Sequence, residues 1–160
     1  MVGILSAEYK KLQSMAAYTA HVGCRGAQEF RKGTPMRHIK IDASEDAGAV
    51  LRAAGSFLSR APVENNLVLT VLHERAKHPE PGRYWTVASD GRLAGLALQS
   101  PPAVPALLTA IPPDCIEELA SVMAADRPNL PGIFGEAAVV SRFAGYAKAS
   151  AAKRARNSNS

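Results

Sequence analysis

The sequence predicts an α/β (α+β) domain in which a small, mostly antiparallel sheet is flanked by four helices. First, 47% of the 160 residues are hydrophobic and 21% are charged, a balance that is ordinary for one domain with a packed core. Second, segments with apolar residues at helical spacing are interspersed with segments that alternate apolar and polar residues, as strands do. Third, two apolar runs flank Asp90-Gly91, a pair typical of a tight hairpin turn.

The N-terminal stretch differs in composition from the rest of the chain. Residues 1–35 are small, polar and basic, and we expect an extension that is poorly ordered or partly helical, with a candidate helix at 7–18. Met36 then opens a new pattern and is the expected natural start. The domain is predicted to occupy 36–148, and a disordered basic tail is predicted at 149–160.

A strand and a helix open the domain. Ile39 and Ile41 alternate with polar neighbours, which predicts a strand. Ser44 predicts a helix N-cap, because its hydroxyl can accept a hydrogen bond from a free amide of the first turn. The helix is expected to run to about Arg60, with apolar residues at helical spacing: Val50, Leu51, Ala54, Phe57 and Leu58.

A second helix is predicted from Pro62 to about Lys77. Proline suits the first helical position, and the helix dipole favours Glu64 in the first turn. The run LVLTVL at 67–72 alone resembles a strand. Helical spacing continues through Arg75, however, which is too long for a strand and favours the helix.

The hairpin is the clearest local pattern. RYWTVAS and RLAGLALQS lie on either side of Asp90-Gly91, which tolerates the positive φ angles of a type I′ turn. Residues 104–111 predict a third antiparallel strand, which Pro105 restricts to a sheet edge or to a late start.

A helix, a turn and a last helix complete the predicted domain. Asp114 caps or begins a helix that reaches about Ala125, LPGIFG at 130–135 predicts a turn, and a final helix is expected from Glu136 to Lys148. The apolar residues expected to face inward are Ile116, Leu119, Ala120, Met123, Val139, Val140, Phe143 and Ala147.

The distribution of charge disfavours a nucleic-acid partner. Residues 1–40 hold seven Lys or Arg against two acidic residues, and residues 148–160 hold four basic residues and no acid. Residues 41–147 hold eight basic and twelve acidic side chains. Because phosphate recognition needs basic residues clustered on one face, we expect no nucleic acid on the domain and a solvated tail at the end.

The cysteines and the apolar runs indicate a cytoplasmic protein. Cys24 and Cys115 are far apart in the sequence, without the spacing of a metal site or redox pair, and are expected to be free thiols in a reducing compartment. No secretory leader is apparent, and no run approaches the roughly 20 apolar residues that cross a bilayer. We therefore expect no membrane partner.

Three segments together resemble a known family. PVENNLVLTVL at 62–72, the hairpin YWTVASDGRLAGLALQSPP and LPGIFG at 130–135 are similar to segments of bacterial N-acetyltransferases of the GNAT superfamily. The resemblance covers about 51–146. It implies the opening of that fold, in which a strand, two helices and an antiparallel meander precede the cofactor-binding strand and helix. It also implies acetyl transfer from acetyl-CoA to an amine.

The cofactor motif of that family is missing. The family's motif is Arg or Gln, two residues, Gly, one residue, then Gly or Ala, at a strand-to-helix turn whose amides face the pyrophosphate of acetyl-CoA. The glycines of 91–97 lie in the hairpin, and 130–135 lacks the Arg or Gln. No residue is assigned to the cofactor.

Three interpretations stay open. The chain is a truncated or inactive N-terminal half of a GNAT enzyme, whose partner is a separate C-terminal half or a second copy through self-association. Alternatively, it is a non-catalytic module that binds a small molecule or a protein, or it is an unrelated small α/β domain.

Few side chains are candidates for a site, and each has a structural alternative. Glu64 is a general base if it is buried, and otherwise a partner of the helix dipole. Asn65 and Asn66 brace a loop or contact substrate. Trp85 is a substrate-side candidate as well. It faces away from Tyr84 along the strand, so only one of the two is expected to line the core, and the other either packs as an ordinary surface residue or covers a groove.

A near match to a zinc motif is rejected. In HERAKH, His73 and His78 are five residues apart, so they diverge around a helix and cannot share one metal ion. We expect two exposed histidines and no metal.

Overall fold

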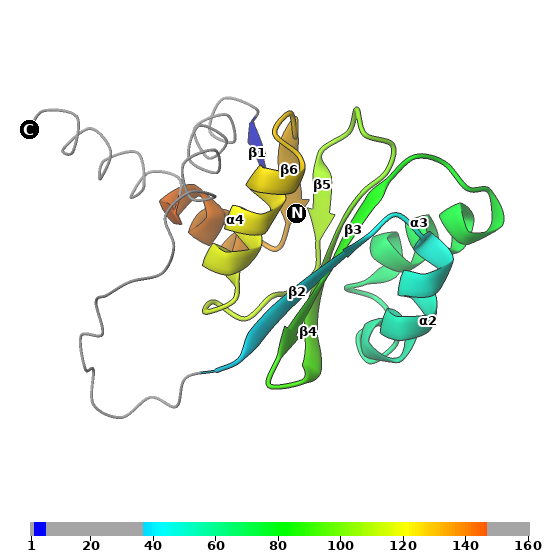
Figure 1. Cartoon of the computed structure of the whole chain (residues 1–160), viewed down its shortest axis with the longest axis horizontal. Coiled ribbons are helices and arrows are strands. Elements are labelled where there is room, and N and C mark those ends of the chain that lie inside the picture. Colours follow the sequence, from blue (N-terminus) through cyan, green and yellow to red (C-terminus); the bar gives the residue numbers. More distant parts are fainter. Residues whose placement is uncertain (1, 6–36, 147–160) are drawn as a thin grey trace, which may run out of the picture.

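The computed structural model describes residues 2–5 and 37–146 (Figure 1). Within them, four helices flank one mixed, mostly antiparallel sheet, which confirms the predicted fold class. The strands are β1 (Val2–Leu5), β2 (Ile39–Ser44), β3 (Arg83–Ser89), β4 (Arg92–Gln99), β5 (Ala106–Leu108) and β6 (Gly132–Gly135). The helices are α2 (Ala47–Leu58), α3 (Asn66–Lys77), α4 (Ile116–Asp126) and a helix at 137–146.

The sheet has six strands in the order β1-β6-β5-β4-β3-β2. Strands β2 to β5 form an antiparallel meander, in which α2 and α3 lie between β2 and β3 along the chain. The connection from β5 through α4 to β6 makes the one parallel pair of this sheet, and β1 then pairs antiparallel with β6. The two edge strands are therefore β1 and β2.

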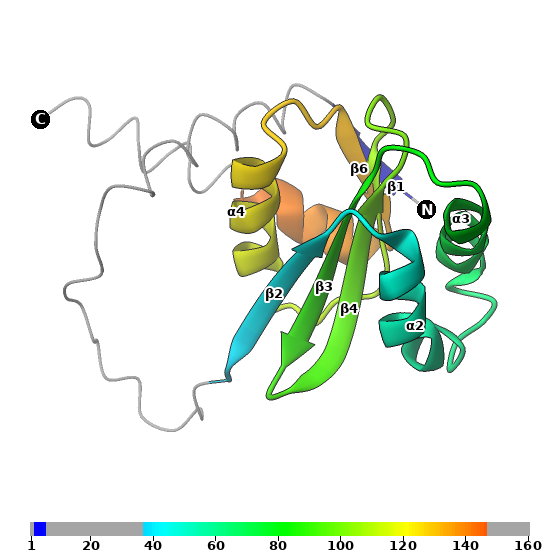
Figure 2. The ribbon, with the colours of Figure 1, turned by 45° about the vertical axis from the view of Figure 1, so that its right-hand side comes forward.

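Helices cover both faces of the sheet. Strands β2, β3 and β4 run between α2 and α3 on one side and α4 on the other (Figure 2). One buried cluster lies on the α4 side and includes Trp85, and a second lies on the α2 side and includes Tyr84. The prediction that only one of these aromatic residues lines the core is wrong, because a sheet with two covered faces buries both sides of a strand.

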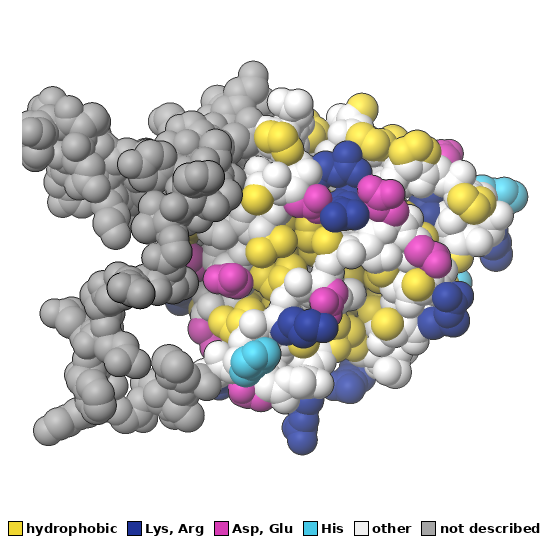
Figure 3. Space-filling view, viewed as in Figure 1, with side chains coloured by type: hydrophobic (Ala, Val, Ile, Leu, Met, Phe, Trp, Pro, Cys, Tyr) yellow, Lys and Arg dark blue, Asp and Glu magenta, His cyan; other side chains and the backbone are white. Residues whose placement is uncertain are grey.

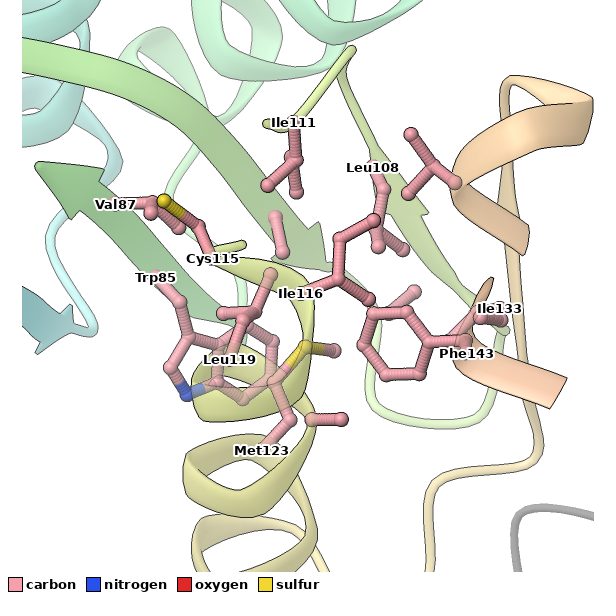
Figure 4. Packing of buried hydrophobic residues seen from close by; sticks show 14 of the residues in the cluster. Trp85, Val87, Leu108, Ile111, Cys115, Ile116, Leu119, Met123, Ile133 and Phe143 are labelled. Atoms are coloured by element: carbon pink, nitrogen blue, oxygen red, sulfur yellow. The ribbon is translucent and has the colours of Figure 1, made fainter. Parts of the chain in front are cut away.

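The larger cluster joins the sheet to α4 and to the helix at 137–146. Figure 4 shows the Trp85 ring beside Leu119 and Met123 of α4, with Phe143 of the last helix reaching toward Ile133 of β6. The inward residues predicted for these two helices are buried, apart from Ala147, which lies outside the described residues.

The hairpin has the geometry that its sequence predicts. Asp90 and Gly91 adopt φ angles of 52° and 75°, as a type I′ turn requires. The Asp90 side chain also accepts a hydrogen bond from the amide of His38 at 2.9 Å, which ties the turn to the start of β2.

Three of the predicted helix starts are corrected. Asp114 neither caps nor begins α4, because the N-cap of this helix is Cys115. Ser44 still belongs to β2, where it pairs with Tyr84, so the cap of α2 is Asp46, whose carboxylate accepts from the Ala49 amide at 2.9 Å. The second helix begins at Asn66 rather than at Pro62, because residues 61–65 form a turn.

Two strands differ from the expectation. LPGIFG contains a strand, β6, instead of forming a turn. Strand β5 begins at Ala106, directly after Pro105, and lies inside the sheet between β4 and β6, so the late start is confirmed and the edge position is wrong. A proline that precedes the first strand residue removes no ladder hydrogen bond, which explains this position.

Strand β1 lies within the predicted N-terminal extension. Its four residues, Val2–Leu5, pair with β6 in the register Gly3 opposite Phe134. This strand was not among the predicted elements. The candidate helix at 7–18 and the tail at 149–160 lie outside the described residues.

Candidate functional site

The carboxyl end of the parallel pair β5 and β6 is the part of the sheet where a ligand site is expected. In sheets with parallel strands, ligands bind where the chain leaves such strands and enters helices. Here β5 leads through 109–115 into α4, and β6 leads through Glu136 into the helix at 137–146. Gly135 permits the close approach of the two strands, since a Cβ there would lie 3.2 Å from the Leu108 carbonyl oxygen.

The turn from β5 to α4 has few backbone donors to offer a ligand. Pro112 and Pro113 have no N–H. The amide of Thr109 donates to the Leu96 carbonyl, and the amide of Cys115 donates to the Pro112 carbonyl, both at 2.9 Å. A phosphate cradle needs several amides that converge on one point, whereas in this turn two residues have no N–H and two further amides already donate to carbonyls.

Apolar packing fills the same turn. Ile111 is buried and packs over β4, where a Cβ on Gly95 would lie 2.7 Å from Ile111 Cγ1. The Thr109 hydroxyl accepts from the Leu96 amide at 2.9 Å and is 5% exposed. The glycine of β4 therefore makes room for an isoleucine of the protein itself.

Carboxylates occupy the N-terminal ends of the helices that follow strands. Three strand-to-helix turns lie within 37–146. Asp46 caps α2, Asp114 precedes α4, and Glu136 precedes the last helix and accepts from the Val140 amide through its carbonyl. Glu117 and Glu118 add two acids in the first turn of α4. These acids compensate the partial positive charge that would otherwise attract an anion.

The candidate residues around the start of α3 are either exposed to solvent or hold the local backbone in place. Glu64 is exposed and lies before the helix, so it has neither the burial that a general base needs nor a place in the first helical turn. Asn65 is buried and its side-chain amide donates to the Leu58 carbonyl at 3.1 Å, which is the predicted loop brace. Asn66 is exposed, and its carbonyl accepts from the Thr70 hydroxyl at 2.8 Å.

Trp85 belongs to a polar network that sequence reasoning did not find. Its indole N–H donates to Asp126 Oδ2 at 2.8 Å. Arg83 binds both oxygens of Asp126, at 2.6 and 2.9 Å, and lies 3.5 Å from Glu45. The Asp126 hydrogen bond is the main cause of the raised pKa of Arg83.

This network fastens the C-terminal end of α4 to the start of β3. A bidentate Arg–carboxylate pair that also accepts from an indole is strong and directional. Arg83 and Trp85 are two residues apart and so share one face of a strand. This spacing is the sequence feature from which their neighbouring positions could have been predicted. Nothing in the sequence indicated that Asp126 would meet them.

The remaining candidates offer no reactive centre. Cys115 is a buried free thiol, and burial raises its pKa, followed by the charge of Asp114. Such a thiol stays protonated and is a poor nucleophile. His73 and His78 are exposed, as expected. Within 37–146, no three His, Cys, Asp or Glu side chains gather as a metal site would require.

The surface shows mixed charge. On the face in Figure 3, Lys and Arg side chains are interspersed with acidic and apolar ones rather than gathered into one patch. None of the described helices has the length and apolar character needed to cross a bilayer.

Comparisons of the chain with protein-family models, with curated proteins and with solved structures gave no match.

Proposed function

We propose that this chain is a relative of the GNAT N-acetyltransferases that does not transfer acetyl groups by itself and acts as a protein-binding module. The order of the elements supports the relationship. A strand, two helices and an antiparallel meander come first, followed by a helix, a strand and a further helix. The segments quoted for the resemblance fall on α3, on the hairpin and on β6.

The strand-to-helix turns carry the proposal that the chain is not catalytic. The GNAT motif would present free amides and a helix N-terminus to the pyrophosphate of acetyl-CoA. The turn from β5 to α4 has two prolines, a buried Ile111 and the carboxylate of Asp114. This turn therefore does not fit the pyrophosphate of acetyl-CoA, because it offers few amide donors and because Asp114 already pairs with Arg37 at 3.2 Å.

Exposed apolar side chains favour a protein as the partner. Val63, in the turn before α3, is 89% exposed, and Leu67, in the first turn of α3, is 48% exposed. Apolar groups that are solvated on the free chain gain most when a protein surface covers them. To take part in acetyl transfer, such a module would have to associate with a separate chain that carries the strand-to-helix turn for acetyl-CoA.

Isothermal calorimetry tests the catalytic part of the proposal. Acetyl-CoA titrated into the full chain should give no saturable heat, and no CoA should be released in the presence of an amine acceptor. An acetyl-CoA-binding enzyme in the same buffer is the control for sensitivity. Saturable heat with the stoichiometry of one site would contradict the proposal.

A further inference from the structure

The two edges of the sheet are protected in different ways. Strand β2 carries Lys40 and Asp42, which are exposed and form an ion pair at 2.9 Å. Charged side chains on an edge strand discourage pairing with another chain. Strand β6 is Gly-Ile-Phe-Gly and has no charge and no proline. Its outer edge is covered by β1 alone among the described elements.

Few contacts hold strand β1 against the edge of β6. It is four residues long, and its only extensive contact with a described element is with β6. Residues 6–38 separate it from β2 at the opposite edge of the sheet. Pairing that closes so long a loop has an entropic cost, and a strand of four residues has few hydrogen bonds and contacts to offset it.

We propose that the edge of β6 is a strand-accepting site, that β1 is its intramolecular occupant, and that a second copy of this chain pairs with β6 when β1 is released. The two copies would join antiparallel through β6, so the contact is two-fold symmetric and closed. This inference is independent of the proposed lack of acetyl transfer, since it depends only on the sheet.

Phe134 is the reason to expect a second copy. Its side chain is 43% exposed and lies opposite Gly3, which has no side chain to cover it. In an antiparallel pair of β6 strands centred on this residue, Phe134 faces Phe134 and Ile133 faces Gly135 of the other copy. Directly opposed aromatic residues stabilise antiparallel pairs, and Glu136 would face Gly132 rather than another acid.

Proline substitution in the full chain tests the inference. The double variant Gly3→Pro/Ile4→Pro removes two successive amide N–H groups of β1, whichever of them faces β6. Sedimentation velocity over a concentration series should show a monomer for the wild type and a dimer for the double variant. Circular dichroism should show the same helix content for both.

Two further substitutions locate the contact. Phe134→Lys added to the double-proline variant should restore the monomer, because it places a charge on the accepting edge. Val104→Lys is the matched control, since Val104 is an exposed apolar residue, at 38%, outside β6, and should leave the dimer intact. The inference is overturned if the double-proline variant stays monomeric, if it loses helix content, if the wild type is already a dimer, or if both lysine variants behave alike.

Discussion

Tyr84 carries its hydroxyl into the core on the α2 side of the sheet. The residue is 1% exposed, and within 37–146 its oxygen has no hydrogen-bond partner. A buried hydroxyl without a partner loses its hydrogen bonds to water and receives nothing in return. The ring contributes to packing, whereas the oxygen opposes folding.

Tyr84→Phe is therefore expected to raise the free energy of unfolding by about 1 kcal/mol, because it removes the unsatisfied hydroxyl and keeps the ring. Urea denaturation of the two proteins measures the difference. Tyr146→Phe is the matched control, since the Tyr146 hydroxyl lies 3.0 Å from the Ser121 hydroxyl, and its removal should lower stability slightly. A loss of stability in Tyr84→Phe would show that the hydroxyl has a partner.

Cys115 gives a prediction about pH. Its pKa is raised above the ordinary 9.0 by burial and then by Asp114. The folded chain thus holds the thiol proton to higher pH than the unfolded chain does. The contribution of the protonated Cys115 thiol to the free energy of unfolding is complete below about pH 9. It is lost as the pH rises through the pKa that this thiol has in the folded chain.

The wild type should accordingly lose more stability than Cys115→Ala when the pH is raised from 8 toward 11. Urea denaturation of both proteins across this range measures the difference, and Cys24 is common to both. Parallel stability curves would contradict a buried, proton-retaining thiol at this position.

Two glycines in or beside regular elements differ in the space around their Cα atoms. Gly82, directly before β3, lies so close to the end of β4 that a Cβ would be 3.1 Å from the Gln99 carbonyl oxygen and 2.9 Å from Ser100 Cβ. Gly55, inside α2, would place a Cβ in open space. One glycine is required by packing, and the other only weakens a helix.

Gly82→Ala should lower the free energy of unfolding by about 1–3 kcal/mol through overpacking. Gly55→Ala should raise it by about 0.5–1 kcal/mol through helix propensity. Thermal and urea denaturation of both variants beside the wild type check the opposite signs. Equal effects would mean that β3 and β4 are not in close contact at Gly82.

Local chemistry explains which elements could be predicted. The hairpin and α4 follow from turn residues and from apolar spacing within one segment. Strand β6 could not be predicted in this way, because Gly132 and Gly135 have low strand propensity and the strand forms only through pairing with β5 and β1. Ser44 was a plausible cap until its pairing with Tyr84 extended β2.

The whole molecule determines what the candidate site can do. Sequence reasoning could predict that the GNAT cofactor motif is missing and that Asn65 braces a loop. It could not predict that Ile111 packs over Gly95, or that Asp126 meets Arg83 and Trp85, since these contacts join residues 16 to 43 positions apart. Such contacts depend on the arrangement of the sheet and helices.

The proposed lack of acetyl transfer requires that the turn from β5 to α4 is closed to the pyrophosphate of acetyl-CoA. Backbone amide NMR spectra of the full chain, recorded during a titration with acetyl-CoA, test this at the residues concerned. We expect the amide signals of Ala110, Ile111 and Asp114 to stay in place up to the highest concentration of acetyl-CoA in the titration. Saturable shifts of these signals, with those of the first turn of α4, would contradict the proposal.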